Sequence, residues 1–67
     1  MEIGQAVKIA RIVAKVRQKH LANRLGISPS YLSLIENGER ELTVEMLVRI
    51  GAELGVRPSV LLEMIGK

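Results

Sequence analysis

A chain of 67 residues with a net charge of +3 has room for one small core, so we expect residues 1–67 to form a single domain. It has no cysteine and one histidine, which excludes a disulfide framework and a cysteine–histidine metal site, and 48% hydrophobic with 1% aromatic residues favours a bundle of short helices. No apolar run approaches the ~18 residues of a membrane span and no signal-peptide pattern occurs, so we expect a cytoplasmic protein without a membrane partner.

The first predicted helix runs from about residue 2 to residue 14 or 15. The apolar stripe that would face the core consists of Ile3, Ala6, Val7, Ala10 and Ala14. Ile9, Ile12 and Val13 widen this apolar arc well beyond one stripe. Two interpretations are open, extra core packing or a contact surface for a second subunit or another protein, and we favour the first.

The second predicted helix covers residues 18–25, and it ends at a glycine. Its inward face is made by three residues at helical spacing, Leu21, Ala22 and Leu25. Gly26 follows, and glycine reaches positive φ without a Cβ clash, so it is a natural C-terminal stop. His20 lies off the inward face, and we expect it to be solvated rather than to bind a metal.

The third predicted helix starts with strong signals and presents an unusual outward face. Ser28 is placed to cap it and Pro29 to occupy its first position, and it ends near Asn37, before Gly38. Leu32 and Ile35 would face the core. The outward residues are short, nearly uncharged side chains, Ser30, Ser33, Leu34 and Asn37. A face of this kind lets a helix enter a groove closely.

The positive charge is concentrated on these two helices and the loop that follows them. Residues 15–40 hold five basic and two acidic residues, whereas the remaining five basic and five acidic residues cancel. This is the sign expected for a surface that faces phosphates. Ordinary solubility is the alternative explanation for the same charges.

A fourth helix is predicted from the cap Thr43 to the stop Gly55, and a fifth begins at Arg57-Pro58. The inner stripe of the fourth helix is Val44, Leu47, Ile50, Gly51 and Leu54. In the fifth helix we expect two leucines to close the core, Leu61 and Leu62. The candidate residues for a dimer interface are Leu61, Met64 and Ile65.

The patterns QxxLAxxLGIS at residues 18–28 and LxxIENG at residues 32–38 resemble the phage-repressor and Cro-type helix-turn-helix family of bacterial regulators, also called the xenobiotic-response-element family. The likeness spans about residues 3 to 62. It implies an all-α, lambda-repressor-like bundle of about five short helices with the helix-turn-helix at helices 2 and 3. It also implies a sequence-specific regulator of transcription, most simply a repressor that binds a two-fold symmetric operator in double-stranded DNA as a homodimer through the major groove.

The resemblance also assigns roles to individual residues. Phosphate contacts would come from Gln18, Lys19, Asn37 and Arg40, and base contacts from Pro29, Ser30, Ser33 and Leu34. Because relatives often carry hydrogen-bonding side chains such as glutamine where Pro29 and Leu34 stand, we expect readout weighted toward apolar and serine contacts, with DNA shape contributing. Arg11 and Glu36 would form a mostly buried ion pair between the first and third helices.

The sequence departs from the family between its first two helices. The family favours a glycine near Lys15 and a serine or threonine near Arg17. Without them we expect either a nearly continuous helix or a strained turn.

A rival hypothesis is a protein-interaction module, such as an antitoxin or a restriction-system controller that also binds its own operator, with Ile9, Ile12 and Val13 binding the partner. An enzyme finds no support, because the sequence holds no nucleophile–base pattern, no metal-ligand cluster and no phosphate-cradling glycine loop. We therefore expect no catalytic residues, metal or cofactor.

Overall fold

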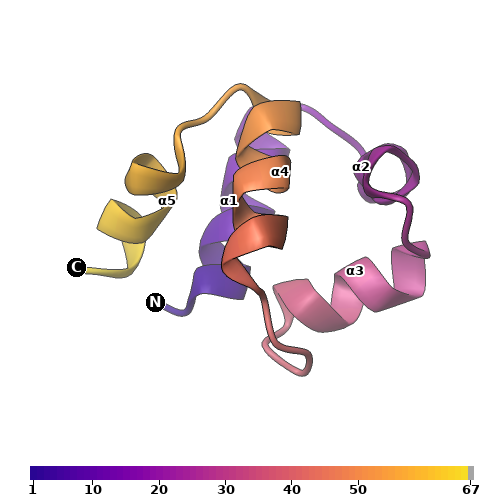
Figure 1. Cartoon of the computed structure of the whole chain (residues 1–67), viewed down its shortest axis with the longest axis horizontal. Helices are drawn as coiled ribbons and strands as arrows, with labels where there is room; N and C mark the ends of the chain where they lie inside the picture. Colours follow the sequence, from indigo (N-terminus) through magenta and orange to yellow (C-terminus); the bar gives the residue numbers. More distant parts are fainter. Residues whose placement is uncertain (67) are drawn as a thin grey trace.

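The computed structural model describes residues 1–66 and contains five helices (Figure 1). They are α1 (Ile3–Val13), α2 (Gln18–Leu25), α3 (Pro29–Glu36), α4 (Val44–Leu54) and α5 (Pro58–Ile65). The described residues form no strand, and none of their helices is both long and apolar enough to cross a membrane. The prediction of an all-α bundle of five short helices is confirmed.

Two layers of helices flank a central pair. In Figure 1, α1 and α4 lie at the centre, α5 covers one side of them, and α2 and α3 lie on the other side. α1 contacts α3, α4 and α5, while α2 contacts α3 and α4. The third helix is therefore held at two places, by α1 and by α2.

An aliphatic core lies between the five helices. Its buried members are Val7, Leu21, Ala22, Leu25, Leu32, Leu47, Ile50, Leu54 and Leu61. Ile3 and Ala10 are partly buried and pack against this core, as predicted. The chain has no cysteine and only one aromatic residue, so burial of these aliphatic side chains is the main source of its stability.

Five apolar positions differ from the sequence-based expectation. Val44, predicted for the inner stripe of α4, is 77% exposed because it is the first residue of the helix and the buried part begins at Leu47. Ile12 and Val13 are 56% and 74% exposed, Leu62 is 49% exposed, and Ala14 is exposed as well. The buried residues of α1 are Gly4, Ala6, Val7 and Arg11. Ile12 and Val13 fall outside this face near the end of the helix, so the interpretation of them as extra core residues is wrong. Leu62 turns outward because its neighbour Leu61 occupies the core.

Gly4 lets the first helix approach the third very closely. A Cβ atom added at Gly4 would overlap the backbone carbonyl oxygen of Ile35. Only glycine permits this contact, because every other residue carries that atom. The position of α3 relative to α1 is thus set partly by backbone against backbone.

The junction between α1 and α2 is the strained turn rather than the continuous helix. Lys15 has φ of 59°, in the left-handed region that favours glycine. The Val16 N–H bonds to the Arg11 carbonyl at 3.1 Å, which closes the turn. Arg17 then occupies the N-cap of α2 in an extended conformation, and its side chain makes no capping bond.

Replacing Lys15 with glycine should raise the free energy of unfolding by about 0.5–1 kcal/mol, because the relief of left-handed strain exceeds the entropy that glycine adds to the unfolded chain. Urea unfolding followed by circular dichroism measures this. The matched control is Lys8→Gly, an exposed position inside α1, which should lower stability by about 1 kcal/mol. A Lys15→Gly variant no more stable than the original chain would contradict the strain.

Candidate nucleic-acid interface

Two short helices joined by a tight turn form the candidate interface. Gly26 follows α2 with φ of 75°, and the Ile27 N–H bonds to the Ala22 carbonyl at 3.0 Å. Ser28 Oγ accepts a bond of 3.0 Å from the Tyr31 N–H at the start of α3, and Pro29 is in the first turn. These local signals fix the angle at which the chain enters α3.

A buried network of three side chains joins α1, α2 and α3. Arg11 Nε lies 2.7 Å from Glu36 Oε2, and Arg11 Nη2 donates to Glu36 Oε1 at 3.2 Å. Gln18 Nε2 donates to the same Glu36 oxygen at 3.0 Å. The Arg11 and Glu36 side chains are only 11% and 1% exposed. We call Arg11, Gln18 and Glu36 the buried network.

The buried network is also fully satisfied. Arg11 Nη1 donates to the Val16 carbonyl at 3.0 Å, so the guanidinium additionally braces the strained junction. Among residues 1–66, no buried side-chain nitrogen or oxygen lacks a hydrogen-bond partner. A bidentate, desolvated ion pair of this kind has a restricted geometry, so it holds α1 and α3 in a defined position relative to each other.

The four predicted phosphate-contacting residues occupy different environments. Gln18 is half-buried, and one N–H of its side-chain amide is bonded to Glu36, which leaves the second N–H of that amide as a donor. Lys19, Asn37 and Arg40 are exposed. The Arg40 guanidinium carbon lies 6.0 Å from the centre of the Tyr31 ring, a cation–π contact that limits where this cation points.

The four predicted base-contacting residues all lie on α3. Pro29 and Ser30 are exposed, whereas Ser33 and Leu34 are half-buried. The Leu34 carbonyl accepts bonds from the Glu39 and Arg40 N–H groups at 2.8 and 3.2 Å, so the following loop folds against the end of α3. The beginning of α3 is therefore its most accessible part.

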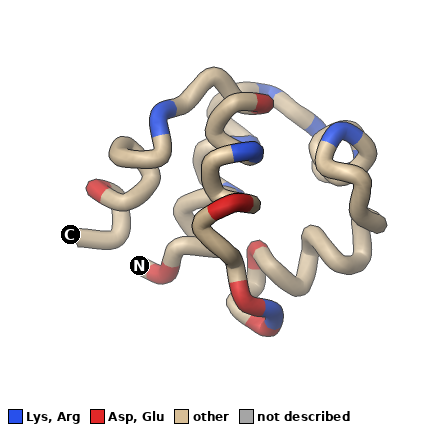
Figure 2. The backbone as a smooth tube through the Cα atoms, viewed as in Figure 1, with Lys and Arg blue, Asp and Glu red and all other residues tan. Residues whose placement is uncertain are grey.

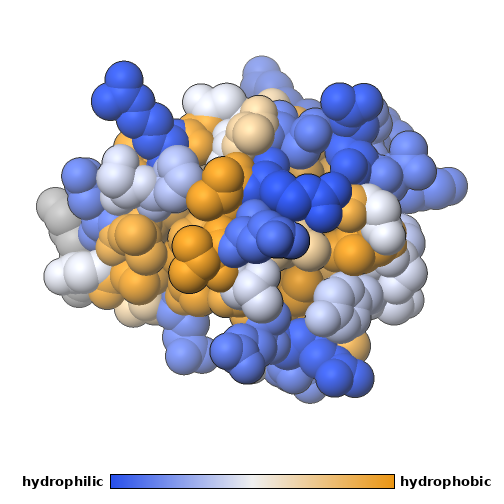
Figure 3. All heavy atoms as spheres, in the orientation of Figure 1, coloured by the Kyte–Doolittle hydropathy of each residue, from blue (hydrophilic) through white to orange (hydrophobic). Residues whose placement is uncertain are grey.

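One residue predicted for the dimer interface is buried in the core instead. Leu61 has no exposed surface because it packs into the core, so it cannot contact a second copy. Met64 and Ile65 are half-buried. Figure 3 shows apolar surface over α4 and α5, and four large apolar residues of these two helices are exposed, Val44, Val48, Val60 and Leu62.

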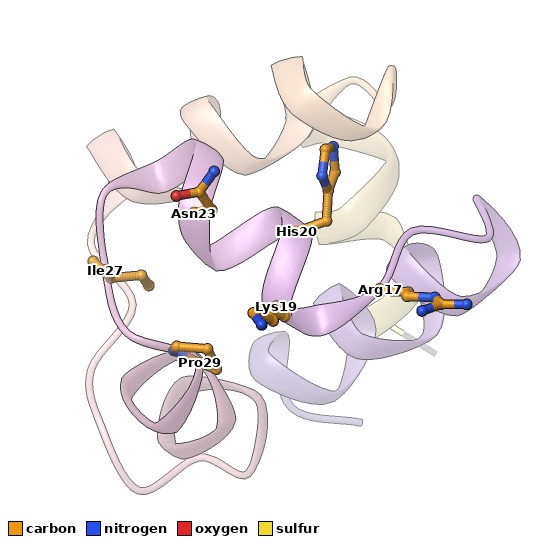
Figure 4. Close-up of a pocket in the computed structure, with 6 residues that line it drawn as sticks. All are labelled: Arg17, Lys19, His20, Asn23, Ile27 and Pro29. Carbon is orange, nitrogen blue, oxygen red and sulfur yellow. The ribbon is translucent and has the colours of Figure 1, made fainter.

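A basic hollow on the outer side of α2 was not foreseen from the sequence. The hollow, which we call the α2 pocket, measures about 390 Å³ and is lined by Arg17, Lys19, His20, Asn23, Ile27 and Pro29 (Figure 4). His20 is solvent-exposed, as expected. A signal was present in the basic residues on either side of Gln18, but periodicity alone does not reveal a concave surface formed by a helix, a turn and the start of another helix.

Charge is distributed unevenly around α3. In Figure 2, basic residues gather on α2 and on the junction before it, whereas the loop after α3 mixes both signs. That loop places Arg40 between Glu39 and Glu41. Within residues 1–66 no group of three or more potential metal ligands occurs.

Comparisons with known proteins agree with this geometry. The helix-turn-helix family model matches residues 7–61. The chain is 44% identical over 54 residues to the HTH-type transcriptional regulator RamB of Mycobacterium tuberculosis. The match covers 81% of this chain but 11% of that regulator, so the chain spans about a tenth of the curated relative.

Two crystal structures share the fold. Both are of the clp gene regulator ClgR from Corynebacterium glutamicum, with a TM-score of 0.86 and 32% identity. Each match covers 90% of this chain, and it covers 64% of one ClgR chain and 78% of the other. The family and these relatives are regulators of transcription rather than enzymes, as the sequence predicted.

Breaking the buried network should be costly. Glu36→Gln, which keeps the shape and removes the charge, strands the Arg11 guanidinium and should lower the free energy of unfolding by about 3–5 kcal/mol. Urea unfolding measures this loss.

The exposed pair Arg24–Glu53 provides the control for that measurement. Its atoms lie 3.0 Å apart, but the two side chains are 58% and 30% exposed. Glu53→Gln should therefore cost less than about 1 kcal/mol. Similar losses for Glu36→Gln and Glu53→Gln would show that burial gives the Arg11–Glu36 pair no special importance.

Proposed function

The chain belongs to the helix-turn-helix family of DNA-binding transcriptional regulators, and we propose that it is a cytoplasmic repressor that binds a two-fold symmetric operator in double-stranded DNA as a homodimer. The observation that carries the proposal is the buried network, which holds α3 rigidly while its uncharged outer face stays accessible between cations. In this proposal residues 1–67 act as one DNA-binding domain.

The dimensions of DNA support insertion of α3 into the major groove. The groove is about 12 Å wide and a helix with its side chains is about 10–12 Å across, so α3 fills it. Pro29 and Ser30, at the exposed beginning of α3, would meet base edges most directly, with Ser33 and Leu34 contributing from further along. Serine hydroxyls bond to several base edges, and apolar groups pack on thymine methyls.

Phosphate contacts would set the register of α3 without reading sequence. Lys19, Asn37 and Arg40 are exposed and polar, and they lie around α3. One side-chain N–H of Gln18 is bonded to Glu36, and we propose that Gln18 meets a phosphate through its second side-chain N–H together with the backbone N–H groups of the first turn of α2, which have no partner inside a helix.

Dimerisation through α5 would place two copies of α3 about one turn of DNA apart, ~34 Å. We propose that Met64 and Ile65 take part together with Leu62, since Leu61 is committed to the core. The half-exposed Leu62 enlarges the apolar area that a second copy would cover.

A second candidate function is a module that binds another protein and also its own operator. Ile12 and Val13 favour it, because apolar side chains exposed at the end of α1 offer a surface that another protein can cover. The concentration of positive charge on α2 favours the DNA-binding function.

The test is selection of random duplex DNA by the purified chain at moderate salt, followed by sequencing. The proposal predicts enrichment of an inverted repeat with half-sites about one turn apart. Retention that depends on salt but enriches no sequence would indicate non-specific binding only. That result would favour the protein-partner function over the proposed one.

Variants should then separate base reading from phosphate binding. Ser30→Ala and Leu34→Ala should each relax base preference, by about 1 kcal/mol at the affected position, because a base contact is lost. Arg40→Ala should weaken all sequences alike. Fluorescence anisotropy on the enriched duplex and on a scrambled one measures both, with unfolding curves to confirm that Leu34→Ala is folded. An equal loss on the two duplexes from Leu34→Ala would defeat its assignment.

A further inference from the structure

Tyr31 is the only aromatic residue of the chain, and it lies at the surface of α3 rather than in the core. Its side chain is 38% exposed, whereas the buried core consists of aliphatic residues. Aromatic rings are large apolar groups that usually contribute to a core. A single ring left at the surface of the helix that is proposed to enter DNA therefore indicates another use.

The position of Tyr31 in the sequence of α3 places it on one flank of the helix. Successive residues of an α-helix are rotated by about 100°, so Tyr31 lies about 200° from Pro29 around the axis. Pro29 lines the α2 pocket. Tyr31 therefore lies on the flank away from that pocket. Because a helix in the major groove has one DNA strand beside each flank, this ring faces the strand that the α2 pocket does not reach.

The loop after α3 is held against the helix by its backbone. The Glu39 and Arg40 N–H groups both bond to the Leu34 carbonyl, at 2.8 and 3.2 Å. Leu42, two residues further on, packs against the core. The backbone of Arg40 is thus fixed close to the end of α3, and only the direction of its side chain remains to be set.

The Arg40 side chain extends to Tyr31 rather than to the neighbouring carboxylates. Its guanidinium carbon lies 6.0 Å from the centre of the ring, within the range of cation–π attraction. Glu39 and Glu41 are exposed on either side of it in the sequence, and the loop carries both signs of charge (Figure 2). Among residues 1–66, however, no carboxylate lies within ion-pair distance of the Arg40 guanidinium.

The two kinds of partner leave an arginine in different states. A carboxylate neutralises the guanidinium and takes up two N–H donors of its fork. An aromatic ring attracts the cation through its electron-rich face, so the charge and most of the donors stay available to another anion. The contact with Tyr31 therefore keeps Arg40 ready to bind a phosphate.

We propose that Tyr31 is a positioning residue for DNA binding, an inference that rests on the proposed function. Its ring holds the Arg40 guanidinium beside α3 and away from Glu39 and Glu41, so that the fork of N–H donors meets a phosphate of the strand on that flank. Tyr31 acts through Arg40 and reads no base. Without the ring, Arg40 turns to a neighbouring carboxylate and its charge is lost to DNA.

The first measurement uses the full chain without DNA and tests the contact itself. An aromatic ring current displaces the NMR resonances of protons above the ring face upfield, so the side-chain protons of Arg40 should be displaced in the original chain. Tyr31→Phe keeps the ring and should retain the displacement, whereas Tyr31→Leu should remove it. Thermal unfolding confirms that both variants are folded. Undisplaced Arg40 resonances in the original chain would overturn the inference.

The second measurement is a double-mutant cycle on the affinity for the duplex enriched by selection. Tyr31→Leu should weaken binding roughly two- to fivefold, the size of an exposed cation–π contact, and Tyr31→Phe should restore the affinity. Tyr31→Leu should also reduce the slope of log affinity against log salt, although it changes no charge, because a phosphate contact is weakened. In the Arg40→Gln chain, Tyr31→Leu should have no further effect.

A third measurement tests the competition between the ring and the carboxylates. Glu41→Gln removes one competitor, so it should raise the affinity of the Tyr31→Leu chain more than that of the original chain. The matched control is Glu63→Gln, which makes the same charge change at an exposed position of α5, on the other side of the central helix pair (Figure 1). It should change both affinities little and equally.

The remaining outcomes overturn the inference in distinguishable ways. Equal losses from Tyr31→Leu and Tyr31→Phe would make the hydroxyl, rather than the ring, the group that matters. Additive losses from Tyr31→Leu and Arg40→Gln would show that the two residues act independently. Either result leaves the proposed function standing. If the original chain enriches and binds no duplex, the proposed function fails and the positioning role fails with it, whatever the NMR spectra of the free chain show.

Discussion

The ion pair between Arg11 and Glu36 is the interaction on which the rest of the structure depends. It joins α1 to α3 in the core of a 67-residue chain that has no disulfide. Glu36 also accepts a hydrogen bond from the side-chain amide of Gln18. Arg11 also donates one to the carbonyl of Val16, which follows the strained turn at Lys15. Together with the backbone contact that Gly4 permits, these bonds leave α3 one position relative to its neighbours. A rigid helix can enter a groove without the loss of freedom that a mobile one would suffer.

The same arrangement explains how a domain with a small net charge can face DNA. Two helices meet at a turn, so residues from α2, the turn and α3 surround one concave surface, the α2 pocket. The acidic residues lie elsewhere: Glu36 is neutralised inside the protein, Glu53 is paired with Arg24, and Glu39 and Glu41 lie in the loop after α3. The local field beside the start of α3 is therefore more positive than the overall charge of +3 suggests.

The sequence predicted those features of the fold that depend on neighbours along the chain. The caps at Ser28 and Thr43 and the left-handed glycines after α2 and α4 are local, and all are present. The sequence-based predictions for Ile12, Val13, Ala14, Val44 and Leu62 are wrong, because burial at the edge of an apolar stripe depends on which helix covers it. The bond from Gln18 to Glu36 and the α2 pocket were not foreseen either, since each requires the angle between helices to be known. The residues of the ion pair were found through family resemblance rather than through periodicity.

The central claim is that α3 and the α2 pocket, held by the buried network, form the surface that meets DNA. Titration of the isotope-labelled chain with the enriched duplex, followed by amide NMR spectra, tests this claim directly. The account predicts that amide resonances of Lys19, Asn23 and Ser30 shift strongly while those of Ile12 and Val13 stay in place. Shifts confined to the exposed apolar end of α1, with α3 unaffected, would contradict it.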